Sequence, residues 1–250
     1  MKTIFSFLLS LTLCYSVAQR PAADVIKTSK GDLSIQPINH ATLAFTWNGK
    51  TVYTDPNGGK AYEGMAAPDL IFVTDIHGDH FSPETLQAVS TDKTIIIVPQ
   101  AAYDKLSDVL KTKAVVLTNG QTINKLDIAI NAIPMYNLPD ASNNAMHTKG
   151  RGNGYVLTFG NKTIYISGDT AGIPEMRSLK NIDVAFVCMN LPYTMEINEA
   201  ASAVLDFKPK IVYPYHYRGQ NGLSDTEAFK KLVNEGNKDI EVRLRDWYGK

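Results

Sequence analysis

Apolar and polar residues alternate in short runs along most of this chain, a pattern that predicts β-strands more often than long helices. From Ala41 to Thr54, two such runs flank Asn48-Gly49, a pair that supplies the positive φ angles of a type I′ turn. From Gly154 to Ser167, the same pattern recurs around Gly160-Asn161. We therefore predict two β-hairpins.

Each predicted hairpin runs into a turn that carries an aspartate, Asp55 in the first and Asp169 in the second. This recurrence favours an internal duplication of a β-rich half. The alternative is a coincidence between two common turn types.

Further strands are predicted at residues 70–74, 94–98, 114–117, 126–133, 184–188, 211–213 and 241–245. Helices follow several of them. Ser82-Pro83 is typical of a helix start, residues 198–207 form a helix that ends before Pro209, and Ser224 to Glu227 has the pattern of a capping box. We expect an α/β fold in which two β-rich halves pack sheet on sheet with helices outside, a four-layer αββα sandwich.

The composition fits one globular domain over residues 19–250, with 44% hydrophobic and 20% charged residues in the whole chain. Lysine plus arginine equals aspartate plus glutamate at 25 each. No summed charge is therefore available to attract nucleic acid or an anionic membrane surface. The expected partner is a small-molecule substrate, with neither nucleic acid nor stable membrane insertion.

The first 18 residues predict a signal peptide, because an apolar run over residues 4–13 is followed by small residues up to a cleavage site after Ala18. The run is shorter than the ~20 residues of a membrane span, which makes a permanent anchor the lesser alternative. Cys14 raises lipidation as another alternative. Cleavage leaves Cys188 as the only cysteine, so we expect a periplasmic or secreted protein without an intramolecular disulfide.

Asp75 to His80 holds two histidines and two aspartates directly after the apolar run of residues 70–74. Strand ends and the loops after them are where a rigid scaffold presents reactive side chains. Imidazoles and carboxylates together are ligands for divalent first-row metals. The alternative, a polar turn that caps the next helix, accounts for Asp79 but not for the histidines beside it.

The remaining histidines also fall at strand boundaries or in loops. His147 lies in a loop rich in Asn and Gly, His216 follows a predicted strand, and His40 starts the first hairpin. Histidines scattered over a surface would be expected on helix faces as well. Their placement therefore strengthens the metal interpretation.

This ordered set resembles the metallo-β-lactamase superfamily, whose hallmark is the loop motif HxHxDH followed by a lone histidine, an aspartate after a strand and a late histidine. Within it, the chain resembles the branch of L-ascorbate-6-phosphate lactonase and N-acyl-phosphatidylethanolamine-hydrolysing phospholipase D. That resemblance is carried by the His40-Ala41-Thr42 start, the Gly168-Asp169-Thr170 turn and Pro214-x-His216.

The resemblance implies a centre of two divalent metal ions. His77 and His147 would hold the first ion, with Asp75 where the motif has its first histidine. The second ion would be held by Asp79, His80 and His216, and Asp169 would bridge the two ions. Zinc is the expected metal, and the carboxylate of Asp75 keeps manganese and iron as alternatives.

The chemistry that the resemblance implies is metal-assisted hydrolysis, in which two metals lower the pKa of a bridging water and polarise the bond under attack. Asp79 is the expected proton acceptor or orienting group. His40 is expected at the pocket rim as a hydrogen-bond donor, or else as a buried structural histidine. Asp55 is either a partner of a ligand or a plain Asp-Pro turn, and Tyr193 either binds substrate or packs.

The function expected is that of an exported hydrolase acting on a small ester, lactone or phosphodiester. Hydrolysis of β-lactams is an alternative within the same chemistry. A non-catalytic metal-binding or sensor module of the same fold is the alternative from another class, because Asp75 departs from the motif.

Overall fold

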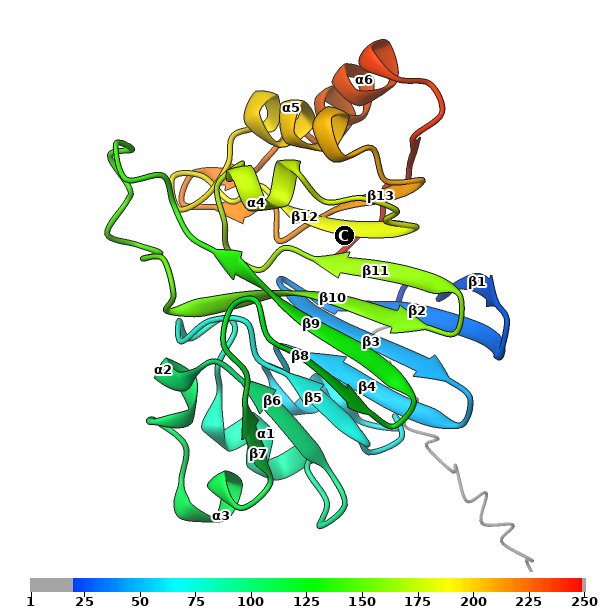
Figure 1. The fold of residues 1–250 in the computed structure, drawn as a ribbon, viewed down its shortest axis with the longest axis vertical. Helices are drawn as coiled ribbons and strands as arrows, with labels where there is room; N and C mark the ends of the chain where they lie inside the picture. Colours follow the sequence, from blue (N-terminus) through cyan, green and yellow to red (C-terminus); the bar gives the residue numbers. More distant parts are fainter. Residues whose placement is uncertain (1–19, 249–250) are drawn as a thin grey trace, which may run out of the picture.

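The computed structural model describes residues 20–248, and the predicted signal peptide lies outside them. Two seven-stranded sheets pack face to face in the middle of the molecule, with helices α1 to α3 on one outer face and α4 to α6 on the other (Figure 1). The predicted four-layer αββα sandwich is confirmed. Within residues 20–248, no helix has the length and apolar character needed to cross a membrane.

The first sheet contains, in spatial order, β1 (Asp24–Thr28), β2 (Gly31–Asn39), β3 (Thr42–Trp47), β4 (Lys50–Thr54), β5 (Leu70–Phe72), β6 (Ile95–Val98) and β7 (Ala114–Val116). The second contains β8 (Thr122–Lys125), β9 (Ile128–Met135), β10 (Gly152–Phe159), β11 (Lys162–Ile166), β12 (Val184–Cys188), β13 (Ile211–Tyr215) and β16 (Glu241–Val242). A short hairpin of β14 (Arg218–Gly219) and β15 (Gly222–Leu223) stands apart from both sheets.

The helices are mostly short. They are α1 (Pro83–Val89), α2 (Gln100–Tyr103), α3 (Asp108–Lys111), α4 (Pro174–Arg177), α5 (Ile197–Phe207) and α6 (Thr226–Gly236), with a 3₁₀ helix η1 (Gly59–Tyr62). The predicted start of α1 is confirmed, because the Ser82 hydroxyl accepts a hydrogen bond from the Thr85 amide and Pro83 is the first helical residue.

The two sheets share one topology. In each, the first three strand pairings are antiparallel and the last three are parallel. The match extends to side chains, since Asp69 before β5 accepts a hydrogen bond from the Thr51 amide and Asp183 before β12 accepts one from the Thr163 amide. This agreement supports the predicted duplication over a coincidence of turns.

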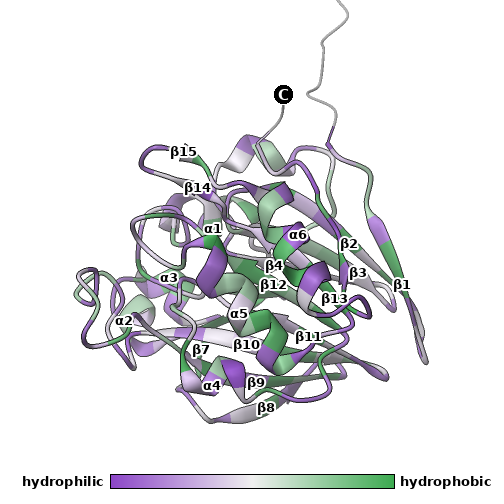
Figure 2. Ribbon diagram, turned by 90° about the horizontal axis from the view of Figure 1, so that it is seen from above, coloured by the Kyte–Doolittle hydropathy of each residue, from purple (hydrophilic) through white to green (hydrophobic). Residues whose placement is uncertain are grey.

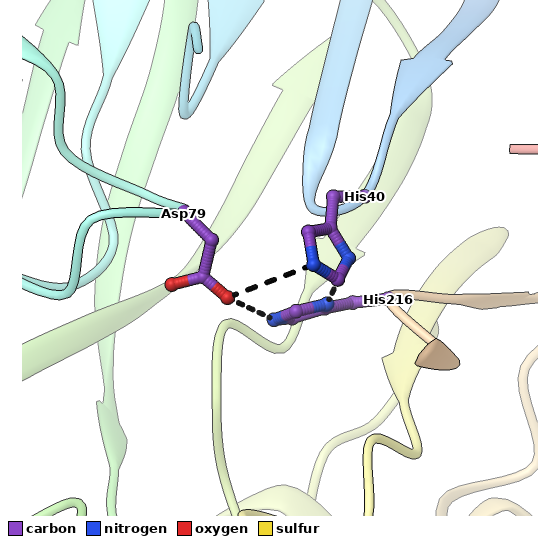
Figure 3. A group of neighbouring side chains, drawn as sticks. All are labelled: His40, Asp79 and His216. Atoms are coloured by element: carbon purple, nitrogen blue, oxygen red, sulfur yellow. Dashed lines mark hydrogen bonds and ion pairs between the residues drawn. The ribbon is translucent and has the colours of Figure 1, made fainter. Parts of the chain in front are cut away.

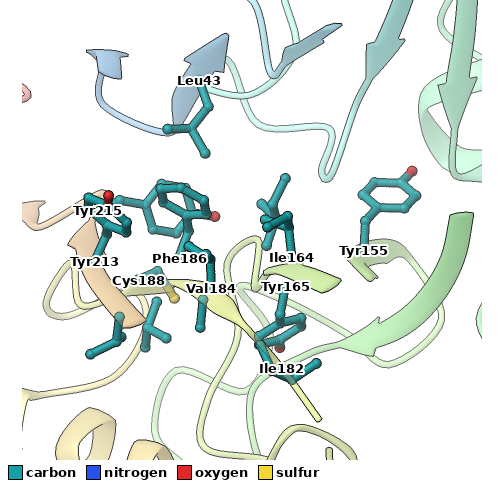
Figure 4. Close-up of a cluster of buried hydrophobic side chains, with 14 of the residues drawn as sticks. Leu43, Tyr155, Ile164, Tyr165, Ile182, Val184, Phe186, Cys188, Tyr213 and Tyr215 are labelled. Carbon is teal, nitrogen blue, oxygen red and sulfur yellow. The ribbon is translucent and has the colours of Figure 1, made fainter. Parts of the chain in front are cut away.

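Apolar side chains from the inner faces of both sheets form the core. Leu43 of β3 points toward Phe186 and Ile164 of the second sheet (Figure 4). Phe186 stacks on Tyr213, with ring centroids 5.0 Å apart. Hydrophobic residues gather in the central strands, and polar residues lie mainly in loops and on outer helix surfaces (Figure 2). Burying each large apolar side chain contributes about 1.5–3 kcal/mol, so this layer holds the two halves together.

The structure corrects two details of the sequence predictions. Leu126 was predicted to begin a strand, but Leu126 and Asp127 have φ angles of 53° and 65° and form the turn between β8 and β9. Ser224 was predicted to cap a helix, but Asp225 caps α6 by accepting a hydrogen bond from the Ala228 amide. The Ser224 hydroxyl instead donates to the Met189 carbonyl, which fixes the chain before the helix.

Candidate metal centre

All seven predicted ligands meet at one end of the sandwich, although they come from distant parts of the chain. The loop of Asp75 to His80 follows β5, and His147 lies in the loop between β9 and β10. Asp169 follows β11, and His216 follows β13. Strand ends that share one edge of the sandwich therefore place these side chains together, as the sequence predicted.

Asp75, His77 and His147 form one group of candidate ligands, called here the first subsite. The Nδ1 atom of His77 lies 2.7 Å from Oδ2 of Asp75, and Nε2 of His147 lies 3.8 Å from the same oxygen. Asp75 and His147 are buried, whereas His77 is partly exposed toward the cavity described below.

His80, Asp169 and His216 form the second subsite, with Asp79 at its edge. The Nε2 atoms of His80 and His216 face each other at 3.1 Å. They lie 3.4 and 3.2 Å from Oδ1 of Asp169. Oδ2 of Asp79 lies 3.3 Å from Nε2 of His216. Two imidazole nitrogens and two carboxylates thus converge on one point.

Asp169 faces both subsites. Its Oδ1 atom faces the second subsite, whereas Oδ2 lies 3.2 Å from Nε2 of His147 in the first. The preceding residue, Gly168, has a φ angle of +60°, and a Cβ atom there would lie 2.5 Å from the sulfur of Met135. Its amide donates a 3.0 Å hydrogen bond to the Tyr215 hydroxyl. The positive φ angle and this crowding favour glycine at the turn that positions Asp169.

The residues fit a divalent cation. Both ring nitrogens of His147 and Oδ1 of Asp169 are buried and make no well-aligned hydrogen bond among the described residues, although Nε2 of His147 and Oδ1 of Asp169 lie within ion-pair distance of other candidate ligands. A buried polar atom without a partner costs about 1–3 kcal/mol, which coordination to a cation would remove. Imidazole nitrogen and carboxylate oxygen are the usual ligands of zinc and related metals.

The carboxylates of the site are ionised, and although burial opposes it, Asp169 raises the pKa values of His80 and His216, so both rings release a proton when a cation binds. Burial alone would raise the pKa of Asp169, but the charges of His216 and His80 outweigh it and hold that pKa well below its usual value. Burial likewise opposes ionisation of Asp79, yet the hydrogen bond with His216 and the charge of His80 lower its pKa. Both groups are therefore carboxylates, the form that binds metal.

Asp55 contacts His80 through Nδ1, the ring nitrogen on the side away from the second subsite. Its Oδ2 atom lies 2.8 Å from Nδ1 of His80, and its Oδ1 atom accepts a 2.7 Å hydrogen bond from the Thr74 amide. Asp55 is fully buried. This contact fixes the ring so that Nε2 points into the second subsite, which favours the role of ligand partner over a plain turn.

His40 lies against His216 and near Asp79 (Figure 3). It is not among the described residues that line the cavity, so a rim position in direct reach of substrate is not what the structure favours. Its Nδ1 atom is 3.0 Å from Nδ1 of His216 and 2.8 Å from the hydroxyl of Tyr248. Its Nε2 atom lies 4.0 Å from Oδ2 of Asp79. Burial and the neighbouring His216 lower the pKa of His40 to about 4, so the ring is neutral near pH 7.

Three residues at the site were missed by the sequence analysis. Arg151 binds Asp75, Asn190 lies 3.2 Å from Nε2 of His216 through its amide nitrogen, and Tyr248 contacts His40. Asn190 had a usable signal, because it follows the strand of residues 184–188 as Asp75 follows its own strand. Arg151 and Tyr248 had none, since they reach the site only through tertiary contacts.

A cavity of about 300 Å³ opens onto both subsites. It is lined by His77, Asp79, Met146, His147, Asp169, Asn190 and Tyr193. The cavity places Tyr193 where a bound molecule would touch it.

The family model of the β-lactamase superfamily domain matches residues 34–216. A metal-dependent hydrolase of Pyrococcus abyssi is 30% identical over 223 residues, which cover 84% of this chain and 96% of that protein. The chain belongs to the metallo-β-lactamase superfamily. It is a hydrolase whose activity depends on divalent metal.

Two solved structures agree with this assignment. A protein from Parabacteroides distasonis described as a metal-dependent hydrolase has a TM-score of 0.82 and 37% identity, and the match covers 91% of this chain and all of that one. A metallo hydrolase from Ignicoccus hospitalis shares the fold at a TM-score of 0.69 and 21% identity, with 86% and 95% of the two chains covered. The relatives favour the hydrolase over the non-catalytic module. The narrower branch stays a prediction.

The contact between Asp55 and His80 generates a test. Asp55→Asn should weaken zinc binding by roughly 10–100-fold, because His80 loses the partner that orients its ring. The affinity can be measured by competition with a chromogenic chelator. Asp69→Asn is the matched control, since Asp69 also accepts a backbone hydrogen bond, from Thr51, but lies outside the two subsites. Equal affinities for both variants would contradict the orienting role.

Proposed function

We propose that this hydrolase binds two divalent cations, zinc being the expected metal, one at each subsite with Asp169 between them. The observation that carries the proposal is the orientation of Asp169, whose two oxygens face different subsites at 3.2 Å from His147 and His216. A carboxylate in this position is suited to bridge a metal pair. The ring nitrogens of His147, which are buried and make no well-aligned hydrogen bond, support an occupied first subsite.

Divalent cations held by these residues would make a nucleophile available from water near neutral pH and would polarise the carbonyl or phosphoryl oxygen under attack. The protein contributes the proton transfer. Asp79 lines the cavity and its side chain is 35% exposed, so its carboxylate can accept a proton from the attacking water and return it to the leaving group. His40 acts on the outer nitrogen of His216 and keeps that ring in place.

The substrate proposed is a small ester, lactone or phosphodiester with an uncharged, partly apolar group beside the reactive bond. Apart from the candidate ligands, the cavity is lined by Met146, Asn190 and Tyr193, and no lysine or arginine is among its described lining residues. Asn143 donates a 2.9 Å hydrogen bond to the Pro192 carbonyl and so ties together the loops that carry Met146 and Tyr193. This lining favours an ester or lactone over a substrate with a second anionic group.

Export to the periplasm or the medium is also proposed, supported by the apolar run of residues 4–13 and the small residues before Gln19. The intact mass of the full-length chain recovered from a bacterial periplasmic fraction tests it. The expected mass is that of a chain that begins at Gln19. An uncleaved chain retained in the cytoplasm would contradict export.

The bridging role of Asp169 gives the central test. Asp169→Asn should lower the zinc content from about two ions per chain to one or fewer and abolish hydrolysis, because it weakens binding at both subsites. Elemental analysis is combined with a screen of a generic phosphodiester, a lactone and a chromogenic β-lactam. Asp183→Asn, the same change at an aspartate before β12 that lies outside both subsites, should keep both metal and turnover. Two ions and full activity in Asp169→Asn would overturn the bridging role.

The cavity lining predicts how KM depends on the length of the acyl group of an ester substrate. With p-nitrophenyl esters, KM should fall as the acyl group lengthens from acetyl to hexanoyl, because Met146 and Tyr193 bury the added methylenes. Tyr193→Ala and Met146→Ala should flatten this dependence while leaving the zinc content unchanged. An identical dependence on chain length in the wild type and both variants would show that the substrate does not contact this wall.

A further inference from the structure

Asp75, which stands where the superfamily motif has a histidine, is paired with an arginine that the motif does not include. Nε of Arg151 lies 3.2 Å from Oδ1 of Asp75, and Nη2 lies 3.1 Å from Oδ2. Asp75 is fully buried, and the Arg151 side chain is only 19% exposed. Two parallel N–H···O bonds of this kind fix a carboxylate in one plane.

The pair leaves one oxygen of Asp75 directed at the first subsite. Oδ2 lies 2.7 Å from Nδ1 of His77 as well as being held by Arg151. Arg151 also donates to the Met146 carbonyl, next to His147 in the chain. Arg151 thus joins Asp75 to the loop that carries His147, the third member of the first subsite.

The Asp75–Arg151 pair also affects the net charge of the first subsite. Replacing a neutral imidazole by a carboxylate adds one negative charge to a buried group of ligands, and the guanidinium adds one positive charge beside it. The net charge of the Asp75–Arg151 pair is zero, which equals the charge of the neutral histidine that the motif has at this position. The first subsite therefore keeps the net charge of a set of neutral imidazoles, although its ligand is an oxygen.

We propose that Asp75 and Arg151 act as one unit in place of the first histidine: Asp75 supplies Oδ2 to the cation, and Arg151 orients the carboxylate and cancels its charge. Arg151 is a positioning residue in this unit. The inference rests on the proposed function, because it assumes a cation at the first subsite.

The unit predicts that restoring the motif histidine alone damages the centre. In Asp75→His, the Arg151 guanidinium loses its partner and repels the cation at the first subsite, so the second equivalent of zinc should bind at least tenfold more weakly. Adding Arg151→Met to that variant removes the repulsion and should restore two equivalents. Arg151→Met alone should bind the second equivalent more weakly than the wild type, because the Asp75 carboxylate loses the two contacts that orient it.

Zinc binding to the metal-free proteins is measured by competition with a chromogenic chelator, and elemental analysis gives the stoichiometry. Circular dichroism shows whether each variant is folded. Arg245→Met is the matched control, because Arg245 forms the same two-bond pair with Asp24, at 2.8 and 2.6 Å, away from both subsites. It should bind zinc as the wild type does.

Each contrary result has a distinct meaning. If Arg151 only supports its loop, Arg151→Met should weaken zinc binding in both backgrounds, and the double variant should be worse than Asp75→His alone; that result overturns the unit. Asp75→His with two equivalents at wild-type affinity overturns it too. A wild-type protein that binds fewer than two equivalents would instead contradict the binuclear centre itself.

Discussion

Burial of charge at one end of an apolar sandwich is the constraint on which this structure depends. Asp55, Asp75 and Asp169 are almost completely inaccessible to solvent. An isolated buried carboxylate is costly, so each needs compensating partners. Asp55 has His80 and the Thr74 amide, Asp75 has His77 and Arg151, and Asp169 has the surrounding histidines. Binding of divalent metal would complete this compensation, because the ring nitrogens of His147 and Oδ1 of Asp169 are buried without a well-aligned hydrogen bond.

The two β-rich halves share one backbone topology, but they carry different site residues at corresponding positions. Asp55 and Asp169 follow the corresponding strands β4 and β11, yet Asp55 orients a ligand and Asp169 faces both subsites. After β5 the chain carries the histidine-rich loop, whereas after the corresponding β12 it carries Asn190. Equivalent backbone positions thus support different chemistry, because only the backbone geometry is shared.

Local patterns explain which features were predictable from the sequence. Asn48-Gly49 predicted a hairpin because both residues have positive φ angles, 48° and 70°. The candidate ligands were predictable because they follow strand ends. The hairpin of β1 and β2 was missed although Leu33 and Ile35 alternate with polar residues. The partnership of Arg151 with Asp75 could not be predicted, since it joins residues 76 positions apart with no local signal.

The origin of the donors in each subsite has a consequence for assembly. The first subsite takes Asp75 and His77 from one half of the chain and His147 from the other, and the second subsite combines His80 with Asp169 and His216 in the same way. Neither half holds a complete set of donors, so the sheets must dock in register before a cation can bind. A chain that folds with its two halves misaligned would therefore be inactive, and its substrate specificity would not simply be altered. Measured turnover thus reports that the whole chain is correctly assembled.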